Sequence, residues 1–255
     1  MATCKASCAV IARNLSVSFS GHQVLNDLSA EKPPRNLTVI VGRSAGKSTF
    51  LRSLNRLNEE ISGSRTEGTV KLSFKDGTVD IYRERFRLEE LRRRVGMAFQ
   101  TPHPLPTSIE KNLSLPLKLV LNVTSSEIGA RIEQALTVAH LWSEVKNRLK
   151  EPALSLSGGQ QQRLCLARTI ALEPEILLLD EPTASLDFKA SEKIENLLSE
   201  LKRDYTIVAV SHSIGQARRI ADNILVMKEG KIFTAIGAPQ FQVSGSLEDL
   251  LNEVF

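Results

Sequence analysis

The pattern of apolar and polar positions predicts strands that alternate with helices along most of the chain. Short β-branched or leucine-rich runs, such as 37–41 (LTVIV) and 176–179 (ILLL), are typical of strands buried on both faces. Between them, 47–57 (KSTFLRSLNRL) has the apolar spacing of a helix with one buried face. The same criteria predict strands over 9–19, 23–30, 95–99, 206–210, 224–227 and 231–235, and helices over 82–94, 159–172, 189–203 and from 247 onward. This alternation predicts an α/β fold with a largely parallel central sheet.

Two segments depart from the alternation. Residues 68–79, with a turn at Asp76-Gly77, predict a β-hairpin. The stretch from about 108 to 152 is mostly helical, and several prolines interrupt its entry, which suggests an inserted subdomain. We therefore expect a single domain over 1–255, with a core and β subdomain over about 1–105 and 159–255 and a helical insert over about 106–158.

Composition excludes several classes of protein. A chain of 255 residues with 42% hydrophobic content can bury a large core. Its net charge of +4 is too small and too scattered to indicate nucleic-acid binding. The 3 cysteines form no zinc-like pairs and imply reduced thiols, as in the cytosol. No apolar run approaches the ~18 residues of a membrane-spanning helix, so a membrane would have to be reached through a partner subunit.

The stretch 41–49 (VGRSAGKST) follows a predicted strand and precedes a predicted helix, which is the context of a phosphate-binding loop. In such a loop Lys47 would neutralise the β- and γ-phosphates, and the Ser48 hydroxyl would hold Mg²⁺. The usual spacing places the first glycine five residues before Gly46, yet Val41 stands there. The loop is one residue short, so either Gly42 replaces that glycine or the phosphate cradle is damaged. A helix start without a ligand is the alternative.

Two further motifs carry candidate chemistry. The run ILLLDE ends in two acids at the carboxyl edge of the predicted sheet, where Asp180 would face a metal and Glu181 would polarise an attacking water. A strand that simply ends at the solvent would have the same sequence pattern. The motif LSGGQ over 156–160 precedes a predicted helix, so Ser157, two glycines and a helix N-terminus could approach one anion.

Together these motifs resemble the ATP-binding-cassette ATPases over nearly the whole chain. LSGGQ is similar to that family's signature, ILLLDEP to its second nucleotide motif, and ASLD over 184–187 to its loop at the dimer seam. Gln100, which ends VGMAFQ, resembles the glutamine that links the nucleotide site to the helical subdomain. His212 in VAVSHS resembles the histidine that contacts the γ-phosphate, and Phe19 stands where an aromatic residue stacks on adenine.

The resemblance implies a P-loop NTPase core with a mixed, largely parallel sheet, an antiparallel β subdomain and an inserted α-helical subdomain. It implies ATP as substrate and Mg²⁺ as cofactor. The implied catalytic residues are Glu181, His212, Gln100 and Lys47, and the implied metal contacts are Ser48, Gln100 and Asp180. The implied nucleotide contacts are Phe19, Gly42, Arg43, Ser44, Ala45, Gly46, Lys47, Ser48, Thr49, Ser157, Gly158, Gly159 and Asp187.

Within the family, segments such as LRRRVGMAFQTPHPLPTSIEKNL are most similar to the phosphate-importer ATPases. That likeness implies ATP hydrolysis coupled to phosphate import, and a homodimer in which the phosphate loop of one subunit and the signature of the other enclose each nucleotide. It also implies membrane permease subunits, an extracytoplasmic solute-binding protein in the same system, and a peripheral location on the cytoplasmic side of the cell membrane. Nucleic acid is not an expected partner.

Two other functions remain open from the sequence. A soluble cassette ATPase outside transport, for example in iron–sulfur assembly, fits the nucleotide motifs, but the proline-bearing stretch after Gln100 disfavours it. A nucleotide-binding regulator with impaired hydrolysis fits the shortened phosphate loop. The retention of Glu181, Gln100 and His212 disfavours that second alternative.

Overall fold

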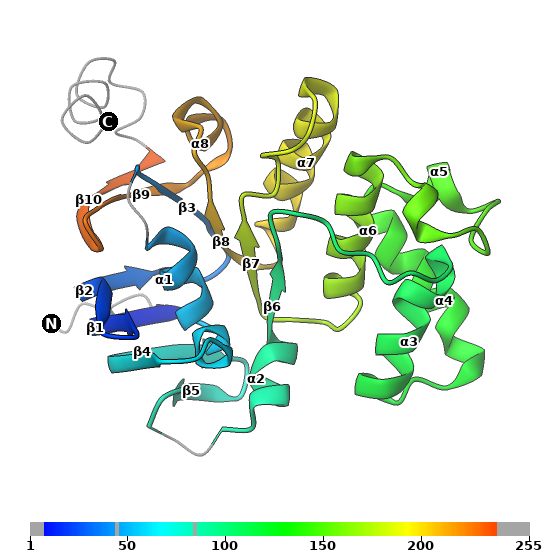
Figure 1. The fold of residues 1–255 in the computed structure, drawn as a ribbon. Helices are drawn as coiled ribbons and strands as arrows, with labels where there is room; N and C mark the ends of the chain where they lie inside the picture. Colours follow the sequence, from blue (N-terminus) through cyan, green and yellow to red (C-terminus); the bar gives the residue numbers. More distant parts are fainter. Residues whose placement is uncertain (1–7, 44–45, 84–85, 239–255) are drawn as a thin grey trace, which may run out of the picture.

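A computed structural model describes residues 8–43, 46–83 and 86–238 and shows two β-sheets beside a group of helices (Figure 1). The larger sheet has the strand order β10-β9-β3-β8-β7-β6, and only the β9–β10 pair is antiparallel. Its strands are β3 (Leu37–Val41), β6 (Val95–Ala98), β7 (Ile176–Asp180), β8 (Thr206–Val210), β9 (Asn223–Lys228) and β10 (Lys231–Gly237). The predicted α/β fold with a mixed, largely parallel sheet is therefore confirmed.

The central strands β3, β7 and β8 are buried throughout because both faces of the larger sheet are covered. In β7, Leu177 and Leu179 point into one core, which α7 (Phe188–Leu201) and α8 (Ile214–Ile220) help to form. Ile176 and Leu178 alternate with them and point into the opposite core. This alternation explains why the short runs lack a polar face in the sequence.

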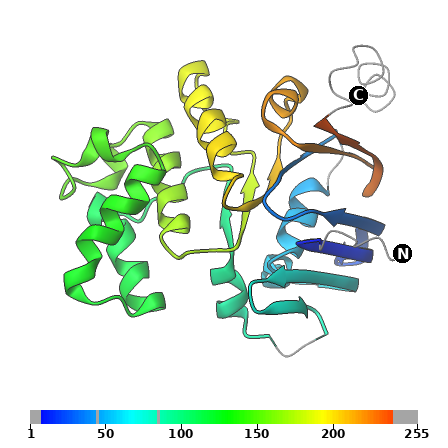
Figure 2. The same ribbon diagram turned by 180° about the vertical axis from the view of Figure 1, so that it is seen from behind.

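The second sheet is antiparallel, with the order β2-β1-β4-β5, and confirms the expected β subdomain. Its strands are β1 (Val10–Phe19), β2 (His22–Lys32), β4 (Ser64–Phe74) and β5 (Gly77–Asp80). Helix α1 (Lys47–Ser53) lies between the two sheets (Figure 2), and Phe50 and Leu51 pack in a core that both sheets share. Since α1 is held from both sides, the loop before it has a fixed end point.

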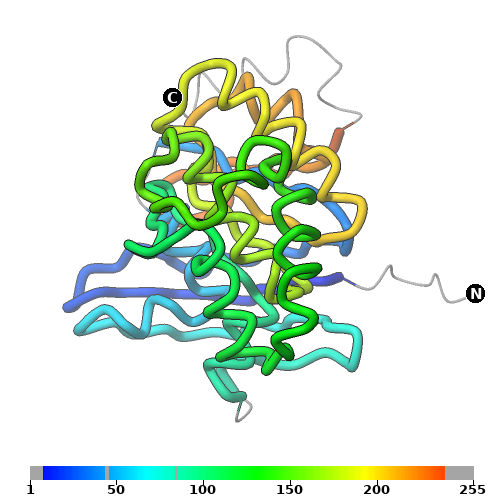
Figure 3. Tube along the Cα trace, turned by 90° about the vertical axis from the view of Figure 1, so that its right-hand side faces the viewer, coloured from blue at the N-terminus to red at the C-terminus, as the bar shows by residue number. Residues whose placement is uncertain are grey.

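Four further helices surround a core of their own and face the viewer in Figure 3. They are α3 (Ile109–Leu121), α4 (Ser125–Val138), α5 (Trp142–Val145) and α6 (Gly158–Ile170). Helix α6 takes part in two cores, since Leu164 and Ala167 pack among the helices while Leu166 and Ile170 pack against the larger sheet. Within the described residues, no helix is long and apolar enough to cross a bilayer.

Several predicted boundaries were wrong. The helix expected over 47–57 ends at Ser53, because Arg56 adopts left-handed backbone angles before a short 3-10 helix over Leu57–Glu60. The helix expected over 82–94 is only α2 (Leu88–Arg94), since Tyr82 instead packs against the core and its hydroxyl donates to the Ser53 carbonyl. Helix α8 was not predicted. The helix expected from 247 lies outside the described residues.

A polar cluster joins the start of α6 to α5 and α7. The Glu144 carboxylate accepts hydrogen bonds from Arg163 at 2.9 Å, Gln160 at 2.8 Å and Lys193 at 3.1 Å. Burial disfavours the ionised form, but these hydrogen bonds outweigh burial and lower the pKa of Glu144 from 4.5 to about 2. A depressed pKa contributes stability that is present above the unfolded-state value and is lost as the pH falls toward about 2.

We expect Glu144→Gln to lower the free energy of unfolding by about 1–2 kcal/mol at pH 7, a value reduced for the partial exposure of the side chain. The difference from the parent should shrink as the pH falls from 5 to 3. Urea unfolding at pH 7, 5, 4 and 3 measures it. A difference that stays constant with pH would show that the carboxylate contributes no ionic stabilisation.

Candidate functional site

The site forms where four parallel strands end. Strands β3, β6, β7 and β8 run in the same direction, so the residues that follow them meet at one edge of the sheet. The loop beginning at Gly42 follows β3, Gln100 closely follows β6, Asp180 ends β7, and His212 closely follows β8. The fold therefore gathers most of the residues that the sequence singled out.

Gly42 has backbone angles that only glycine adopts readily, with φ of 139°. A Cβ atom at this position would lie 2.1 Å from the Met227 carbonyl oxygen. Gly46, with φ of 120°, precedes α1 and its N-terminal turn. Arg43 is exposed, Thr49 is half-buried, and the predicted contacts Ser44 and Ala45 lie outside the described residues. Gly42 thus starts the loop in close contact with β9.

Lys47 is buried at the start of α1, and its ammonium donates to the Gly42 carbonyl at 2.6 Å. Burial lowers the pKa of Lys47, while the nearby carboxylates of Glu181 and Asp180 oppose that shift. The side chain therefore points back across the loop that it follows. Glu181 and Asp180 lie near enough to stabilise its positive charge.

Oxygen atoms suited to a hard cation gather beside Lys47. The Ser48 hydroxyl donates to Asp180 Oδ1 at 2.7 Å, and Arg52 lies 3.6 Å from the other carboxylate oxygen. Gln100 and Asp180 both line an open hollow of 360 Å³. A hydroxyl, a carboxylate and an amide fit Mg²⁺, which commonly takes one or two carboxylates and completes its shell with phosphate and water. Within the described ranges, no group of three or more His, Cys, Asp or Glu residues forms an all-protein metal cage.

Glu181 and His212 face each other across the ends of β7 and β8. The His212 Nε2 atom lies 2.5 Å from Glu181 Oε1, and the two side chains are 61% and 10% exposed respectively. Glu181 has left-handed backbone angles, with φ of 47°, and its N–H donates to the Val210 carbonyl at 3.2 Å. This geometry places a mostly buried carboxylate beside an accessible imidazole.

The signature residues form the start of α6. Ser157 caps the helix and accepts a hydrogen bond from the Gln160 N–H at 3.4 Å, while the Gln160 side chain accepts from the Ser157 N–H at 3.0 Å. Gly158 is exposed, and a Cβ on Gly159 would lie 2.8 Å from Ala190 Cβ. Asp187 caps α7 by accepting from the Ala190 N–H at 2.8 Å.

The structure does not bring every predicted residue to one place. Figures 1 and 2 show α1 and α6 on opposite sides of β6 and β7, so the helix that begins with the signature lies apart from the helix that begins with Lys47. Phe19, at the end of β1, is half-buried against the core that the two sheets share. The chain thus presents a phosphate-loop surface and a separate signature surface.

Sequence reasoning missed three residues next to the site. Arg52 contacts Asp180, Gln160 ties the signature to Glu144, and Gln216 bonds to the serine that precedes His212. Gln160 lies inside LSGGQ and could have been singled out as the glutamine of a capping box. Gln216 had no such signal, because the short helix that carries it was not predicted.

Comparisons with known proteins agree with this arrangement. Residues 25–184 match the protein family described as ABC transporter. Over 221 residues the chain is 44% identical to phosphate import ATP-binding protein PstB 3 of Streptococcus pneumoniae serotype 4, covering 86% of this chain and 87% of that protein. The structure of cbiO1 from Clostridium perfringens, part of the ABC transporter complex cbiONQ, has a TM-score of 0.79 at 25% identity, with coverage of 96% and 95% respectively.

A second solved structure is an ATP-binding cassette in a dimeric, post-hydrolysis state bound to ADP and phosphate. It has a TM-score of 0.74 and 28% identity, and the match covers 90% of this chain and 98% of that one. The family match, the identity and the fold all support the resemblance that the motifs indicated. This chain is therefore a member of the ABC transporter family and one of its ATP-binding proteins.

Proposed function

We propose that this chain hydrolyses ATP to drive an importer of inorganic phosphate. The observation that carries the proposal is the Glu181–His212 pair at 2.5 Å, beside the Ser48–Asp180 contact and Lys47. The 44% identity to a phosphate import ATP-binding protein favours this cargo over a role outside transport. Cargo would be selected by other subunits, so the residues of this chain define the ATPase step.

Each residue has a role that follows from its position. Glu181 is mostly buried and would accept a proton from the attacking water as that water's oxygen approaches the γ-phosphorus. His212 would hold Glu181 in place and contact the γ-phosphate from its accessible side. Lys47 would exchange the Gly42 carbonyl for phosphate oxygens, because its ammonium binds an anionic oxygen more strongly than a neutral carbonyl. The exchange would also neutralise part of the phosphate charge.

Three oxygen-bearing side chains would hold the metal. Ser48 would contact Mg²⁺ directly, Asp180 would do so directly or through water, and Gln100 would approach from the shared hollow. Bound Mg²⁺ supplies neutralisation of the charge on the β- and γ-phosphates. The loop from Gly42 to Thr49 would wrap the phosphates with backbone N–H groups, and Phe19 would stack on the adenine.

A homodimer would complete each nucleotide site. Because α6, which begins with Ser157 and Gly159, lies apart from α1 and Lys47 in one chain, the signature of a second copy would cover the nucleotide bound to the first. Gly158 would lie beside it, and Asp187 would lie at the seam. ABC ATPases dimerise and work within transporter complexes, and one structural neighbour of this chain is a dimer. Two nucleotides would then lie between two subunits, and their hydrolysis would reopen the dimer.

The helical insert would transmit this motion to membrane permease subunits, in a system that includes an extracytoplasmic solute-binding protein. We place the insert at about 106–158 within a single domain over 1–255. The segments that enter and leave the insert lie side by side, since Ser108 pairs with Pro152 and Ala153 N donates to Thr107 O at 2.8 Å. The chain would act at the cytoplasmic side of the membrane.

The shortened loop gives the most direct test of hydrolysis. One added residue lengthens a loop by about 3.3–3.6 Å, so we compare the chain with a variant carrying one glycine inserted between Ser44 and Ala45. We expect both proteins to bind MgATP and to hydrolyse it at rates within about threefold of each other, because Gly42 already has the backbone angles and contacts that start such a loop.

MgATP titration and phosphate release measure binding and turnover in the two proteins. If both proteins bind MgATP and only the inserted variant hydrolyses it, the natural chain binds nucleotide without turning it over. In that case the regulator alternative would replace the ATPase proposal. Co-purification with a membrane permease would separate the importer from a soluble cassette ATPase.

A further inference from the structure

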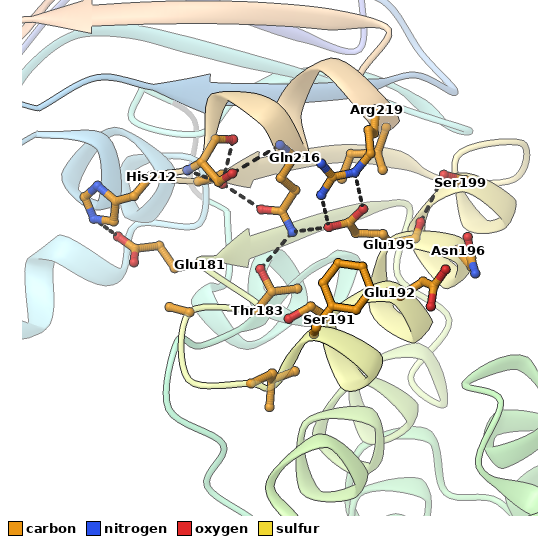
Figure 4. A pocket seen from close by; sticks show the side chains of 16 residues that line it. Glu181, Thr183, Ser191, Glu192, Glu195, Asn196, Ser199, His212, Gln216 and Arg219 are labelled. Atoms are coloured by element: carbon orange, nitrogen blue, oxygen red, sulfur yellow. Dashed lines mark hydrogen bonds and ion pairs between the residues drawn. The ribbon is translucent and has the colours of Figure 1, made fainter. Parts of the chain in front are cut away.

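A hollow of 730 Å³ lies between α7, α8 and the turn after β7 (Figure 4). Glu181 and His212 stand at one end of it, and polar and apolar side chains of α7, α8 and the turn after β7 line the rest. Among these residues Gln216 is 5% exposed and lies on the buried side of α8 with Ala217 and Ile220. A buried amide needs partners for its oxygen and its nitrogen, so its contacts show what it holds.

Gln216 joins the two loops that carry Glu181 and His212. Its Oε1 atom accepts a hydrogen bond from the Ser211 hydroxyl at 2.7 Å. Ser211 directly precedes His212 in the sequence. Its Nε2 atom donates to the Thr183 hydroxyl at 2.8 Å, in the turn where the Ala184 N–H donates to the Glu181 carbonyl. One side chain therefore links the turn after β7 to the loop after β8.

The orientation of this amide is fixed by its third partner. Glu195, on α7, lies with its Oε1 atom 3.3 Å from Gln216 Nε2. A carboxylate accepts hydrogen bonds and does not donate them, so the nitrogen of the amide must face it. Arg219 donates to both carboxylate oxygens of Glu195, at 2.9 and 2.7 Å, and so favours this orientation of the carboxylate.

We propose that Gln216 is a positioning residue that holds Glu181 and His212 at their mutual distance. Its hydrogen bonds fix two loops that are otherwise joined near this point by the Glu181 N–H to Val210 carbonyl contact of 3.2 Å. Among the residues that the structure describes, Gln216 has no hydrogen bond to the phosphate loop or to the expected metal ligands, so its loss acts through the Glu181–His212 pair. This inference rests on the ATPase function proposed above.

The test compares Gln216→Met with the parent chain. Methionine has a similar length and shape, so the packing of α8 is kept while both loop contacts are lost. We expect kcat for ATP hydrolysis to fall about 10-fold to 100-fold, with the KM for MgATP within about twofold of the parent. Ser199→Ala is the matched control, because Ser199 lines the same hollow but bonds only to the Glu195 carbonyl of its own helix.

A rescue variant separates positioning from general damage. Gln216→Glu combined with Glu195→Gln exchanges the amide and the carboxylate between the two positions, so that each keeps a partner. We expect this double variant to recover most of the lost kcat. Equal loss of kcat in Gln216→Met and the double variant, or a rise in KM as large as the fall in kcat, would overturn the proposal.

Amide hydrogen exchange gives a readout that does not require hydrolysis. In Gln216→Met, exchange should accelerate at 181–186 and 211–213 and stay unchanged at 47–53. Unchanged exchange in the first two segments would overturn the inference whatever the enzyme's rate. If the parent chain itself does not hydrolyse ATP, the proposed function fails, while the exchange result still decides whether Gln216 holds the loops.

Discussion

Glu181→Gln is expected to lower kcat for ATP hydrolysis by about 10²–10⁴ while MgATP still binds. The amide has the same shape as the carboxylate but cannot accept the proton of the attacking water. Its position is retained, because His212 can donate to an amide oxygen as it does to Glu181 Oε1, 2.5 Å away. Phosphate release measured together with MgATP titration separates the two effects.

Glu192→Gln provides the control for this change. Glu192 is an exposed residue that lines the same hollow, so the substitution removes an equal charge without touching the pair. We expect its kcat to match that of the parent. If Glu181→Gln kept the parental rate, the water would be activated by another group. The Glu181–His212 pair would then no longer support the proposed function.

Gly42→Ala is expected to weaken MgATP binding by about 100-fold, which corresponds to about 2.7 kcal/mol. A new Cβ would lie 2.1 Å from the Met227 carbonyl oxygen, so either the loop or β9 must move. The backbone angle of 139° adds strain of about 1–3 kcal/mol for a residue with a side chain. Both effects act where the loop must hold the phosphates.

Gly77→Ala is the control that separates the backbone strain of Gly42→Ala from the steric clash of its new Cβ. Gly77, the first residue of β5, has nearly the same φ of 142°, but no atom lies within 4 Å of a Cβ added there. We expect it to lower the free energy of unfolding by about 1–3 kcal/mol while MgATP binds as before. Equal binding by Gly42→Ala and the parent would show that Gly42 has no part in the phosphate cradle.

The sequence predicted the strands of the site well because these runs obey two strong constraints. The segments 37–41 and 206–210 are apolar on both faces and match β3 and β8 residue for residue. Parallel strands also end at one edge, which is why Asp180 and Glu181 were expected where the ligands of such sheets bind, whereas the position of His212 was expected only from the family resemblance. Burial and topology therefore carried most of the information about the site's location.

Contacts within the site could not be predicted in the same way. Helix α8 has only 7 residues, too few for a helical period to stand out, and so Gln216 was missed. The end of α1 depends on the left-handed backbone of Arg56, whose guanidinium also contacts Glu59 and the Ile81 carbonyl. Such boundaries are set by tertiary partners that no local pattern contains.

Helix α6 makes the sheet and the helical region one cooperative unit. Leu166 and Ile170 belong to the core against the larger sheet, while Leu164 and Ala167 belong to the core among the helices. Melting the helical region alone would pull α6 from the sheet and expose apolar surface there, at about 25 cal/mol for each Å². The two regions therefore share their stability, and a substitution that loosens one core lowers the unfolding free energy of both.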